Sequence, residues 1–430
     1  MQRVAVVVNR SGEGKGASQV SQTHPDWLLE GLLVADFSRV LAGPYCTMLL
    51  GDLGAEVVKV ESPAGDDTRH WVPPVRPQDG VATYYLAINR NKRSVVLDFK
   101  DPGDLALAQE LAGRADVFVE NFKPGTLRRF GLDYDSVAAA NPGVIYSSIS
   151  GFGSGAGASL PGYDLIVQAM SGLMSLTGDP DGPAYRAGIS VFDVLAGLHS
   201  TIGILAALQH RSNTGSGRGH HIEASLLASA LSGLVNQTSA YVAGGVVPGR
   251  MGNAHASLFP YEPLPTTDGE LIVAAGNDLQ FRRLCEVLGV PELAADPRFA
   301  RTADRTDRRE ELRPLLVDRL KQRTSEEWFE ALNAAGVPSG PINTVREGVE
   351  YAEKLGLDPV VQVGRGGQAV AGVRHPLTFS ATAPRYDRPP PALDQDGDEV
   401  RAWLATPRER AGRLGANPVP AAAPRPEEGS

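Results

Sequence analysis

Short apolar runs alternate with longer amphipathic stretches from residue 31 to residue 150. The runs are typical of buried strands and lie at 31–38, 55–62, 93–99, 116–122 and 143–150. The stretches between them are typical of helices and lie at 43–54, 103–115 and 126–141. Two parallel strands need a connection of about this length, usually a helix. The alternation therefore predicts an α/β fold whose open sheet carries helices on both faces.

The character of the sequence changes near residue 225. Charged helical stretches dominate beyond it, around one apolar run at 269–276 that is typical of a strand. They end in a Gly/Pro-rich connector at 336–343, after which the chain returns to the first part. We predict a large domain built from both chain ends, with a small α+β domain inserted into it. The predicted bounds are 29–224 and 345–405 for the large domain, 225–344 for the small domain, 1–28 for an N-terminal extension and 406–430 for a disordered tail.

Charge and composition exclude several classes of function. A net charge of −9 argues against a nucleic-acid-binding surface, which needs a basic footprint. Cys46 and Cys285 have neither metal-ligand spacing nor the number needed for a disulfide framework, so we expect a cytoplasmic location. The N-terminus lacks the long apolar run of a signal peptide. The most apolar run, 194–210, is short for a membrane span and carries His199, which favours a buried helix and no membrane association.

Two motifs match known binding sites only in part. Gly151, Gly153 and Ala156 follow a predicted strand, but no helix opens on the third small residue, as a dinucleotide fingerprint requires. A loop is the better interpretation. His220 and His221 lie in a predicted strand, where neighbouring side chains point to opposite faces and do not chelate one ion. We predict no metal site.

Two basic clusters stand out in this acidic chain, at 88–100 and 120–131. Composition alone favours solvated surface charge for both. Both clusters lie at strand termini of the predicted sheet, however, where open α/β sheets form ligand crevices. Arg and Lys side chains next to a Pro-Gly turn would suit a ligand that carries phosphate groups.

Asp193 is a single carboxylate in the apolar, small-residue run "GISVFDVLAG" at 188–197. Burial of an unpaired carboxylate is costly, so the residue needs a reason. Spacing alone favours an N-cap, because an apolar helix follows directly. A helix N-terminus also favours the ionised carboxylate, and an ionised carboxylate in a pocket is a competent nucleophile. Capping and catalysis are therefore compatible.

Several long motifs, in one order, give the chain a specific resemblance to a known family. From about residue 29 to about residue 400 it resembles the class III CoA-transferases, of the formyl-CoA transferase and carnitine CoA-transferase type. The resemblance implies a Rossmann-like large domain, a small inserted domain and an interlocked homodimer. It implies acyl-CoA and a carboxylic acid as substrates, without a tightly bound cofactor. The motifs are "VLAGPYCTMLLGDLGAEVVKVESPAGDDTR", "NRNKRSVVLDFK", "ADVFVENFKPGTLRRFGLDY", "PGYDLIVQAMSGLMSLTG", "GNAHASLFPY" and "GVPSGPIN".

The same resemblance implies a set of site residues. Asp193 stands 29 residues after Asp164, at the position of the family's nucleophilic aspartate. That nucleophile forms a mixed anhydride with the acyl group and then an aspartyl-CoA thioester. Tyr163, Asp164 and Leu41 match positions that support the active site, and backbone amides at the start of the helix could help to stabilise the oxyanions. The CoA contacts implied by position are Val40, Ala42, Leu97, Lys100, Asn121, Phe122, Arg129 and Phe130.

Four departures from the formyl-CoA transferases argue against formyl and oxalate chemistry, and one of them is that "GNAHASLFPY" stands where those enzymes have a run of glycines. Leu41 stands where those enzymes have Gln, Pro161 where they have Lys, and Ser62 where they have Arg. Two alternatives stay open. α-Methylacyl-CoA racemases resemble the chain, but Tyr163 stands where they carry a catalytic His, and a phenol with a pKa near 10 is a poor base at neutral pH. The second alternative is a catalytically silent CoA-binding protein.

Overall fold

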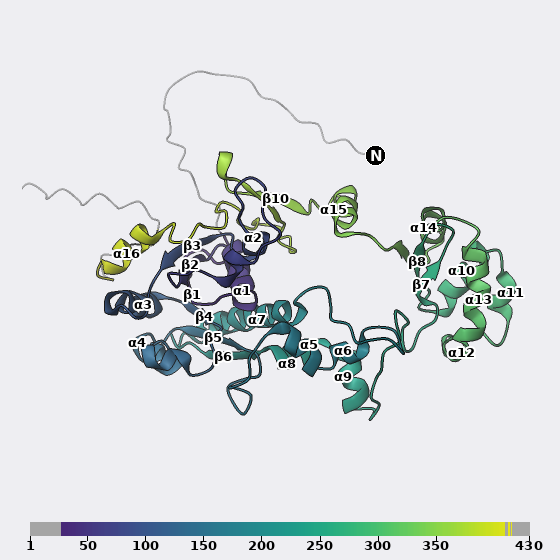
Figure 1. Cartoon of the computed structure of the whole chain (residues 1–430), viewed down its shortest axis with the longest axis horizontal. Coiled ribbons are helices and arrows are strands. Elements are labelled where there is room, and N and C mark those ends of the chain that lie inside the picture. Colours follow the sequence, from purple (N-terminus) through teal and green to yellow (C-terminus); the bar gives the residue numbers. More distant parts are fainter. Residues whose placement is uncertain (1–26, 409–411, 413, 415–430) are drawn as a thin grey trace, which may run out of the picture.

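The computed structural model describes residues 27–408, 412 and 414. A parallel sheet of six strands, in the order β3-β2-β1-β4-β5-β6, forms the centre of the larger body of the molecule (Figure 1). The order reverses between β1 and β4, which creates the switch point where such sheets bind ligands. The strands are β1 (Leu33–Asp36), β2 (Glu56–Glu61), β3 (Lys92–Val96), β4 (Val117–Glu120), β5 (Ile145–Ser150) and β6 (His221–Ser225).

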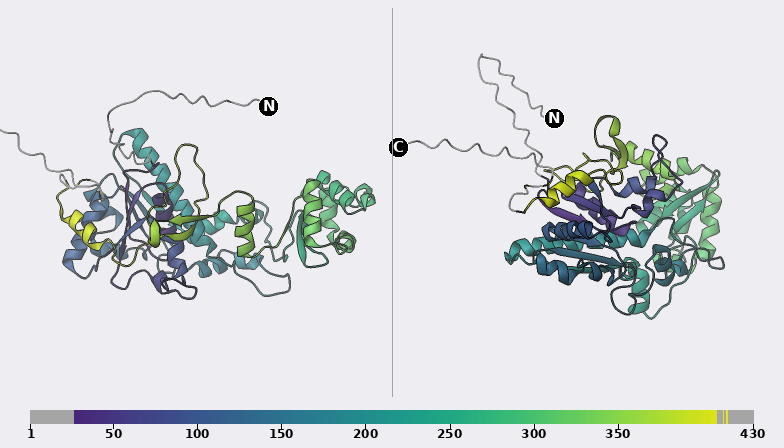
Figure 2. Two further views of the ribbon diagram at one scale, coloured as in Figure 1. Left: turned by 90° about the horizontal axis from the view of Figure 1, so that it is seen from above. Right: turned by 60° about the vertical axis from the view of Figure 1, so that its left-hand side comes forward.

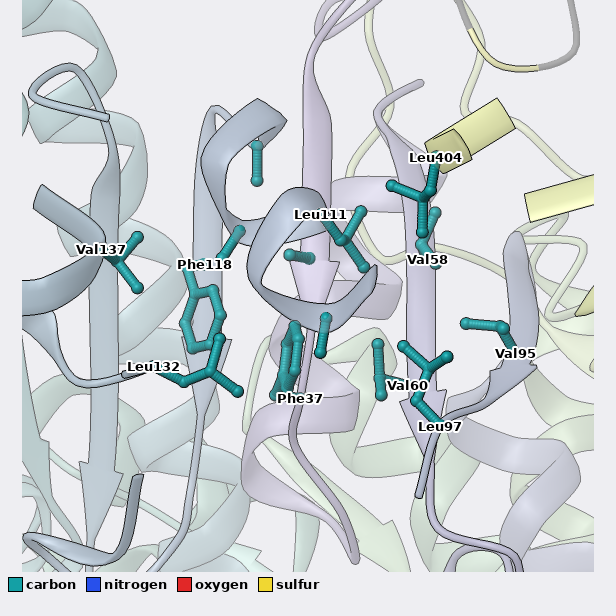
Figure 3. Packing of buried hydrophobic residues seen from close by; sticks show 14 of the residues in the cluster. Phe37, Val58, Val60, Val95, Leu97, Leu111, Phe118, Leu132, Val137 and Leu404 are labelled. Carbon is teal, nitrogen blue, oxygen red and sulfur yellow. The ribbon is translucent and has the colours of Figure 1, made fainter. Parts of the chain in front are cut away.

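Alternate residues of each strand pack into two separate cores. Val58 of β2 and Phe118 of β4 belong to the core under α3 (Pro102–Arg114), α4 (Tyr134–Ala140) and α16 (Gly397–Ala405), which Figure 3 shows. Both views in Figure 2 place α16, in yellow, beside the N-terminal elements. The predicted return of the chain to the large sheet therefore occurs.

The opposite face of the sheet is covered by α1 (Ala42–Asp52), α7 (Val191–Thr214) and α8 (Leu226–Gly233). Of the described helices, α7 is the one with the length and hydropathy of a membrane span. Phe192, Ala196 and Ile204 of α7 lie in the core instead, and the helix packs against α1, α8, β5 and β6. This packing agrees with the buried helix that the sequence predicts.

Shorter elements lie beside the larger body or between it and a smaller body. The helices are α2 (Thr83–Ile88), α5 (Asp164–Met170), α6 (Leu173–Leu176), α9 (Val235–Val242) and α15 (Val345–Lys354), with 3-10 turns η1 (Asp67–His70), η2 (Thr126–Phe130) and η3 (Gly366–Gln368) and a hairpin of β10 (Val360–Val363) and β11 (Val370–Val373). The predicted helix at 126–141 is divided into η2 and α4, because Gly131 takes a left-handed conformation (φ 63°).

A smaller body lies apart from the sheet, at the right of Figure 1. Its antiparallel sheet packs against helices around a core of its own, which includes Phe281 and Trp328. Its elements are β7 (Tyr261–Pro265), β8 (Glu270–Ala274), α10 (Asp278–Val287), α11 (Pro291–Ala295), α12 (Thr302–Asp307), α13 (Arg309–Leu320), α14 (Ser325–Ala334) and β9 (Ser339–Pro341). The α/β class and the separate small unit are confirmed. The domain bounds stay a prediction, and α8, just beyond the predicted boundary, packs in the core of the large sheet.

Candidate active site

Asp193 lies in a cavity of about 780 Å³ at the carboxyl end of the parallel sheet, beside the switch point between β1 and β4. It is the third residue of α7, because the helix begins at Val191 and Ser190 precedes it without a capping side-chain bond. The prediction that Asp193 caps the helix is therefore wrong. Its side chain sits in the first turn and enters the cavity.

Asp164, the first residue of α5, takes the capping role. Its Oδ1 accepts hydrogen bonds from the backbone amides of Phe192 (2.8 Å) and Asp193 (3.1 Å). Its Oδ2 accepts a bond of 2.5 Å from Gln168 Nε2. The start of α7 is thus held by a buried carboxylate from a neighbouring helix. These two amides are therefore not free to stabilise an oxyanion, contrary to the expectation from the sequence.

Gln168 extends this network to the chain that leads into α7. Its Oε1 accepts a hydrogen bond of 2.8 Å from the amide of Ala187, and its Nε2 donates a bond of 3.1 Å to the carbonyl of Ile189. Gln168 is buried. One amide side chain therefore fixes both Asp164 and the approach to Asp193, which positions the carboxylate of Asp193 through the backbone on either side.

The charge state of Asp193 also differs from the expectation. Burial and, to a smaller extent, the nearby negative charge of Asp164 together raise the pKa of Asp193 to about 7. Among the described residues no side chain or amide donates a hydrogen bond to its carboxylate. The helix terminus does not hold Asp193 ionised, because Asp164 occupies the amides that would do so. At neutral pH the residue is poised between its two protonation states.

Most of the predicted site residues share this cavity. Eight of the twelve line it, namely Val40, Leu41, Ala42, Asn121, Phe122, Tyr163, Asp164 and Asp193. Tyr163 is 66% exposed at the rim. The amide side chain of Asn121, however, bonds to both backbone groups of Arg39, at 2.9 and 2.6 Å. The Asn121 side chain therefore fixes the backbone of Arg39 in the cavity wall, and its amide group is not free to bind a ligand.

The other four predicted CoA contacts lie outside the cavity. Leu97 is 2% exposed in the core, so only its backbone could reach a ligand. Phe130 packs edge-on against Phe99, with ring centroids 5.3 Å apart, and the guanidinium of Arg129 lies 4.6 Å from the Phe130 centroid. Lys100 is exposed directly after Phe99. Their contact with CoA stays a prediction for an outer part of the site.

One wall of the cavity is aromatic and was not predicted from the sequence. Trp71 and Tyr84 both line it and pack edge-on, with ring centroids 5.2 Å apart. Burial raises the pKa of Tyr84, and its hydroxyl bonds to the side chain of Ser190, next to the start of α7. No motif marks these positions, since Tyr84 lies in an apolar stretch that reads as ordinary core. Arg39 was also missed, although it directly precedes the motif that begins at Val40.

The two basic clusters have different roles. In the first, Arg90, Lys92 and Arg93 are buried and paired with carboxylates, so neither surface charge nor ligand binding describes them. In the second cluster, the side chains of Lys123, Arg128 and Arg129 are exposed. None of the three forms an ion pair with a described residue. The second cluster alone has unpaired cations next to the cavity, and these can meet phosphate groups.

The structure describes both of the motifs that match known binding sites only in part. Residues 151–160 form turns rather than a helix. His221 bonds to Ser148 Oγ at 3.0 Å, whereas His220 bonds to His210 at 2.9 Å, so the two imidazoles do not converge. The described residues contain no cluster of three or more His, Cys, Asp or Glu that could hold a metal ion.

Comparison with known proteins gives a consistent result. Residues 29–397 match the model of CoA-transferase family III. The chain is 44% identical over 392 residues to a succinate–glutarate CoA-transferase of Agrobacterium fabrum, covering 88% of this chain and 96% of that protein. It is 38% identical over 397 residues to an acetyl-CoA:oxalate CoA-transferase of Acetobacter aceti, covering 91% and 100%.

A solved structure shares the fold. A CaiB/BaiF family protein from Brucella suis superimposes with a TM-score of 0.78 at 42% identity, covering 88% of this chain and 99% of that one. Sequence, fold and the switch-point cavity thus agree on one assignment. The chain belongs to the CoA-transferase family III and is a CoA-transferase.

Proposed function

We propose that this CoA-transferase exchanges CoA between dicarboxylic acids, with Asp193 as a covalent nucleophile. The observation that carries the mechanism is the Asp193 carboxylate itself, which is largely buried, without a hydrogen-bond donor among the described residues, in a cavity of about 780 Å³. A structural carboxylate at such a depth would be paired. An unpaired one in a ligand-sized cavity fits a nucleophile.

The chemistry proceeds by exchange at two carbonyl groups. An oxygen of Asp193 attacks the thioester carbonyl of the donor, the C–S bond breaks, and CoA thiolate leaves a mixed anhydride. The thiolate attacks the Asp193 carbonyl, which releases the donor acid and forms an aspartyl-CoA thioester. The acceptor carboxylate then attacks this carbonyl and releases thiolate again. Attack of the thiolate on the acceptor's carbonyl yields the new acyl-CoA and restores Asp193.

The dicarboxylate assignment draws on two sources. The relatives described above are named for succinate, glutarate and oxalate, which carry two carboxyl groups, although one of them is also named for acetyl-CoA. Lys123 lines the same cavity as Asp193 and supplies positive charge there, whereas Arg39, which also lines it, already pairs with Asp67 at 3.4 Å. A second carboxylate on the acyl chain needs a cation of this kind when it leaves water. The argument against oxalate from Leu41, Pro161 and Ser62 stays a prediction.

We also propose a homodimer, as the family resemblance implies. Apolar side chains are exposed along α9 and the segment after it, where Val242 is 75% and Val247 79% exposed. A second copy of the chain would cover such a surface. Light scattering at micromolar concentration is expected to give twice the chain mass. The cytoplasmic location stays a prediction.

The test is a CoA-exchange assay with a panel of acids. Purified enzyme is mixed with succinyl-CoA and glutarate, oxalate, malonate, acetate or butyrate, and the CoA esters are followed by mass spectrometry. We expect glutaryl- and malonyl-CoA, and little oxalyl-, acetyl- or butyryl-CoA. Solvent deuterium at the α-carbon of a 2-methylacyl-CoA, without any acid acceptor, would instead support a racemase. CoA affinity without exchange across the panel would support a silent binder.

The protonation of Asp193 gives a further prediction. Since only its ionised form attacks, kcat/KM should rise with pH through about 7 and level off above it. Asp164→Asn removes the adjacent negative charge but keeps an oxygen for the α7 amides. We expect the acidic limb to move roughly 0.5–1 pH unit lower. Asp67→Asn changes another carboxylate in the cavity wall and should leave the limb in place. If the acidic limb of the kcat/KM profile does not move in Asp164→Asn, the charge of Asp164 does not raise the pKa of Asp193 and this prediction is wrong.

A further inference from the structure

Val40 has a backbone conformation that its side chain disfavours. Its φ is 69°, in the left-handed region, which is rare for a β-branched residue. The residue lies in the turn Ser38–Val40 between β1 and α1, and it lines the cavity that holds Asp193. Backbone strain of this kind persists only where the surroundings impose it, and it concentrates at functional sites.

The side chains of four residues outside the turn hold it in place. Asp36 accepts a hydrogen bond of 3.0 Å from the amide of Ser38, and Asn121 bonds to both backbone groups of Arg39. Lys59 Nζ donates a bond of 2.9 Å to the carbonyl of Ser38. Asp66 accepts the amide of Val40 at 3.3 Å with each carboxylate oxygen. Nearly every polar backbone group of the turn is therefore fixed by a side chain.

Lys59 and Asp66 form the centre of this arrangement. Their charged atoms are 2.8 Å apart, and each side chain is 1% exposed. Asp66 Oδ1 also accepts bonds from the amide and hydroxyl of Thr68, at 2.9 and 2.8 Å. A buried ion pair contributes little net stability compared with apolar residues of similar size, so its presence asks for another reason. The pair touches both ends of the strained turn.

The turn leads directly into α1, whose first residues lie at the cavity that holds Asp193. Leu41 precedes the helix without a capping side chain, and Leu41 and Ala42 both line the cavity. Among the described residues, no acceptor takes the amides of Leu41 or Ala42. The carbonyl of Ala42 also lies 2.6 Å from where a side chain at Gly197 would begin, one turn along α7 from Asp193. The starts of α1 and α7 thus meet at the cavity.

From these contacts we infer that Lys59 and Asp66 are positioning residues for the transferase reaction. The ion pair forces the left-handed turn at Val40 and thereby aims the free amides of Leu41 and Ala42 at the acyl oxygen beside Asp193. Those amides would stabilise the negative charge that develops on that oxygen, a role that the occupied amides of α7 do not fill. Neither Lys59 nor Asp66 touches the substrate. This inference rests on the proposed function.

The test removes the pair without leaving a lone buried charge. Lys59→Met and Asp66→Asn are combined in the full chain, and kcat/KM for succinyl-CoA with glutarate is measured in three backgrounds: Val40, Val40→Gly and Val40→Ala. We expect a loss of about 10- to 100-fold with Val40, because small displacements of catalytic groups have effects of this size. Glycine adopts the left-handed turn without strain, so the loss in the Val40→Gly background should be several-fold smaller. Alanine keeps Cβ and should not rescue.

A matched control separates positioning from stability. Arg90 and Asp52 form a second buried pair, 2.6 Å apart, at the far end of α1. Arg90→Met with Asp52→Asn should lower the melting temperature without lowering kcat/KM. Hydrogen exchange of the Val40 amide reports on the turn directly and should quicken at least tenfold in the Lys59→Met, Asp66→Asn variant.

The outcomes distinguish the two proposals. Equal losses in all three backgrounds, or unchanged exchange at the Val40 amide, would overturn the positioning role. Absence of CoA exchange in the unaltered enzyme would instead overturn the proposed function, and the amide exchange would still decide whether the ion pair holds the turn.

Discussion

Replacement of Asp193 by Ala is expected to reduce CoA exchange by about 10⁴-fold, because the proposed covalent route then lacks its nucleophile. In that route the Asp193 carboxylate forms both the mixed anhydride and the CoA thioester. Exchange is measured by mass spectrometry of the CoA esters, with succinyl-CoA as donor and glutarate as acceptor. Binding of CoA itself should change little, because the variant keeps the cavity wall and the cations around it.

Chemical trapping sharpens this prediction. Hydroxylamine added to the enzyme with succinyl-CoA should convert the activated residue to a hydroxamate, which peptide mass spectrometry locates. The cavity wall offers three carboxylates, Asp67, Asp164 and Asp193. We expect the modification on Asp193 alone and on none of them in Asp193→Ala. A hydroxamate on Asp67 or Asp164, or near-normal turnover in Asp193→Ala, would contradict the mechanism.

The sheet and its helices could be predicted because their signals are local. Val57 and Val58 alternate between two faces of β2, and this period of two is visible in the sequence. The break between η2 and α4 was missed because one glycine, Gly131, has a left-handed conformation that periodicity does not reveal. Local pattern gives the elements and their order, but not where the backbone turns within them.

The electrostatics of the site could not be predicted from the sequence, because the partners are distant along the chain. Asp164 caps a helix that begins 27 residues later, and this changes the charge state of Asp193. Arg93 pairs with Glu399, 306 residues away, while Arg129 finds no carboxylate among the described residues. Both arginines look alike in the sequence. The tertiary structure alone determines which basic side chains pair with carboxylates in the interior and which stay unpaired and available to a ligand.

The same non-local effect links catalysis to stability. Burial and Asp164 raise the pKa of Asp193 from 3.8 to about 7. Between these two values the folded protein binds a proton that the unfolded chain has released, so the free energy of unfolding falls as the pH rises through this range. Above pH 7 the full penalty applies, because the folded protein then carries a buried anion that no hydrogen-bond donor among the described residues stabilises.

Asp193→Asn should therefore stabilise the protein while it abolishes exchange. The shift corresponds to at most about 4 kcal/mol, and partial solvent access through the cavity lowers this to about 2 kcal/mol. We expect a melting temperature roughly 2–5 °C higher than that of the unaltered protein at pH 8, and a clearly smaller gain at pH 5. Differential scanning fluorimetry at both pH values measures the gain.

Asp181→Asn is the matched control, since Asp181 is exposed and lies outside the cavity wall. It should give no gain that grows with pH. An equal gain for Asp193→Asn at pH 5 and pH 8 would show that packing, rather than charge, limits stability at this position. A gain confined to the higher pH would show that the fold carries an unpaired charge at a cost in stability. In the proposed mechanism the anion attacks the thioester, so selection for catalysis would explain why that cost persists.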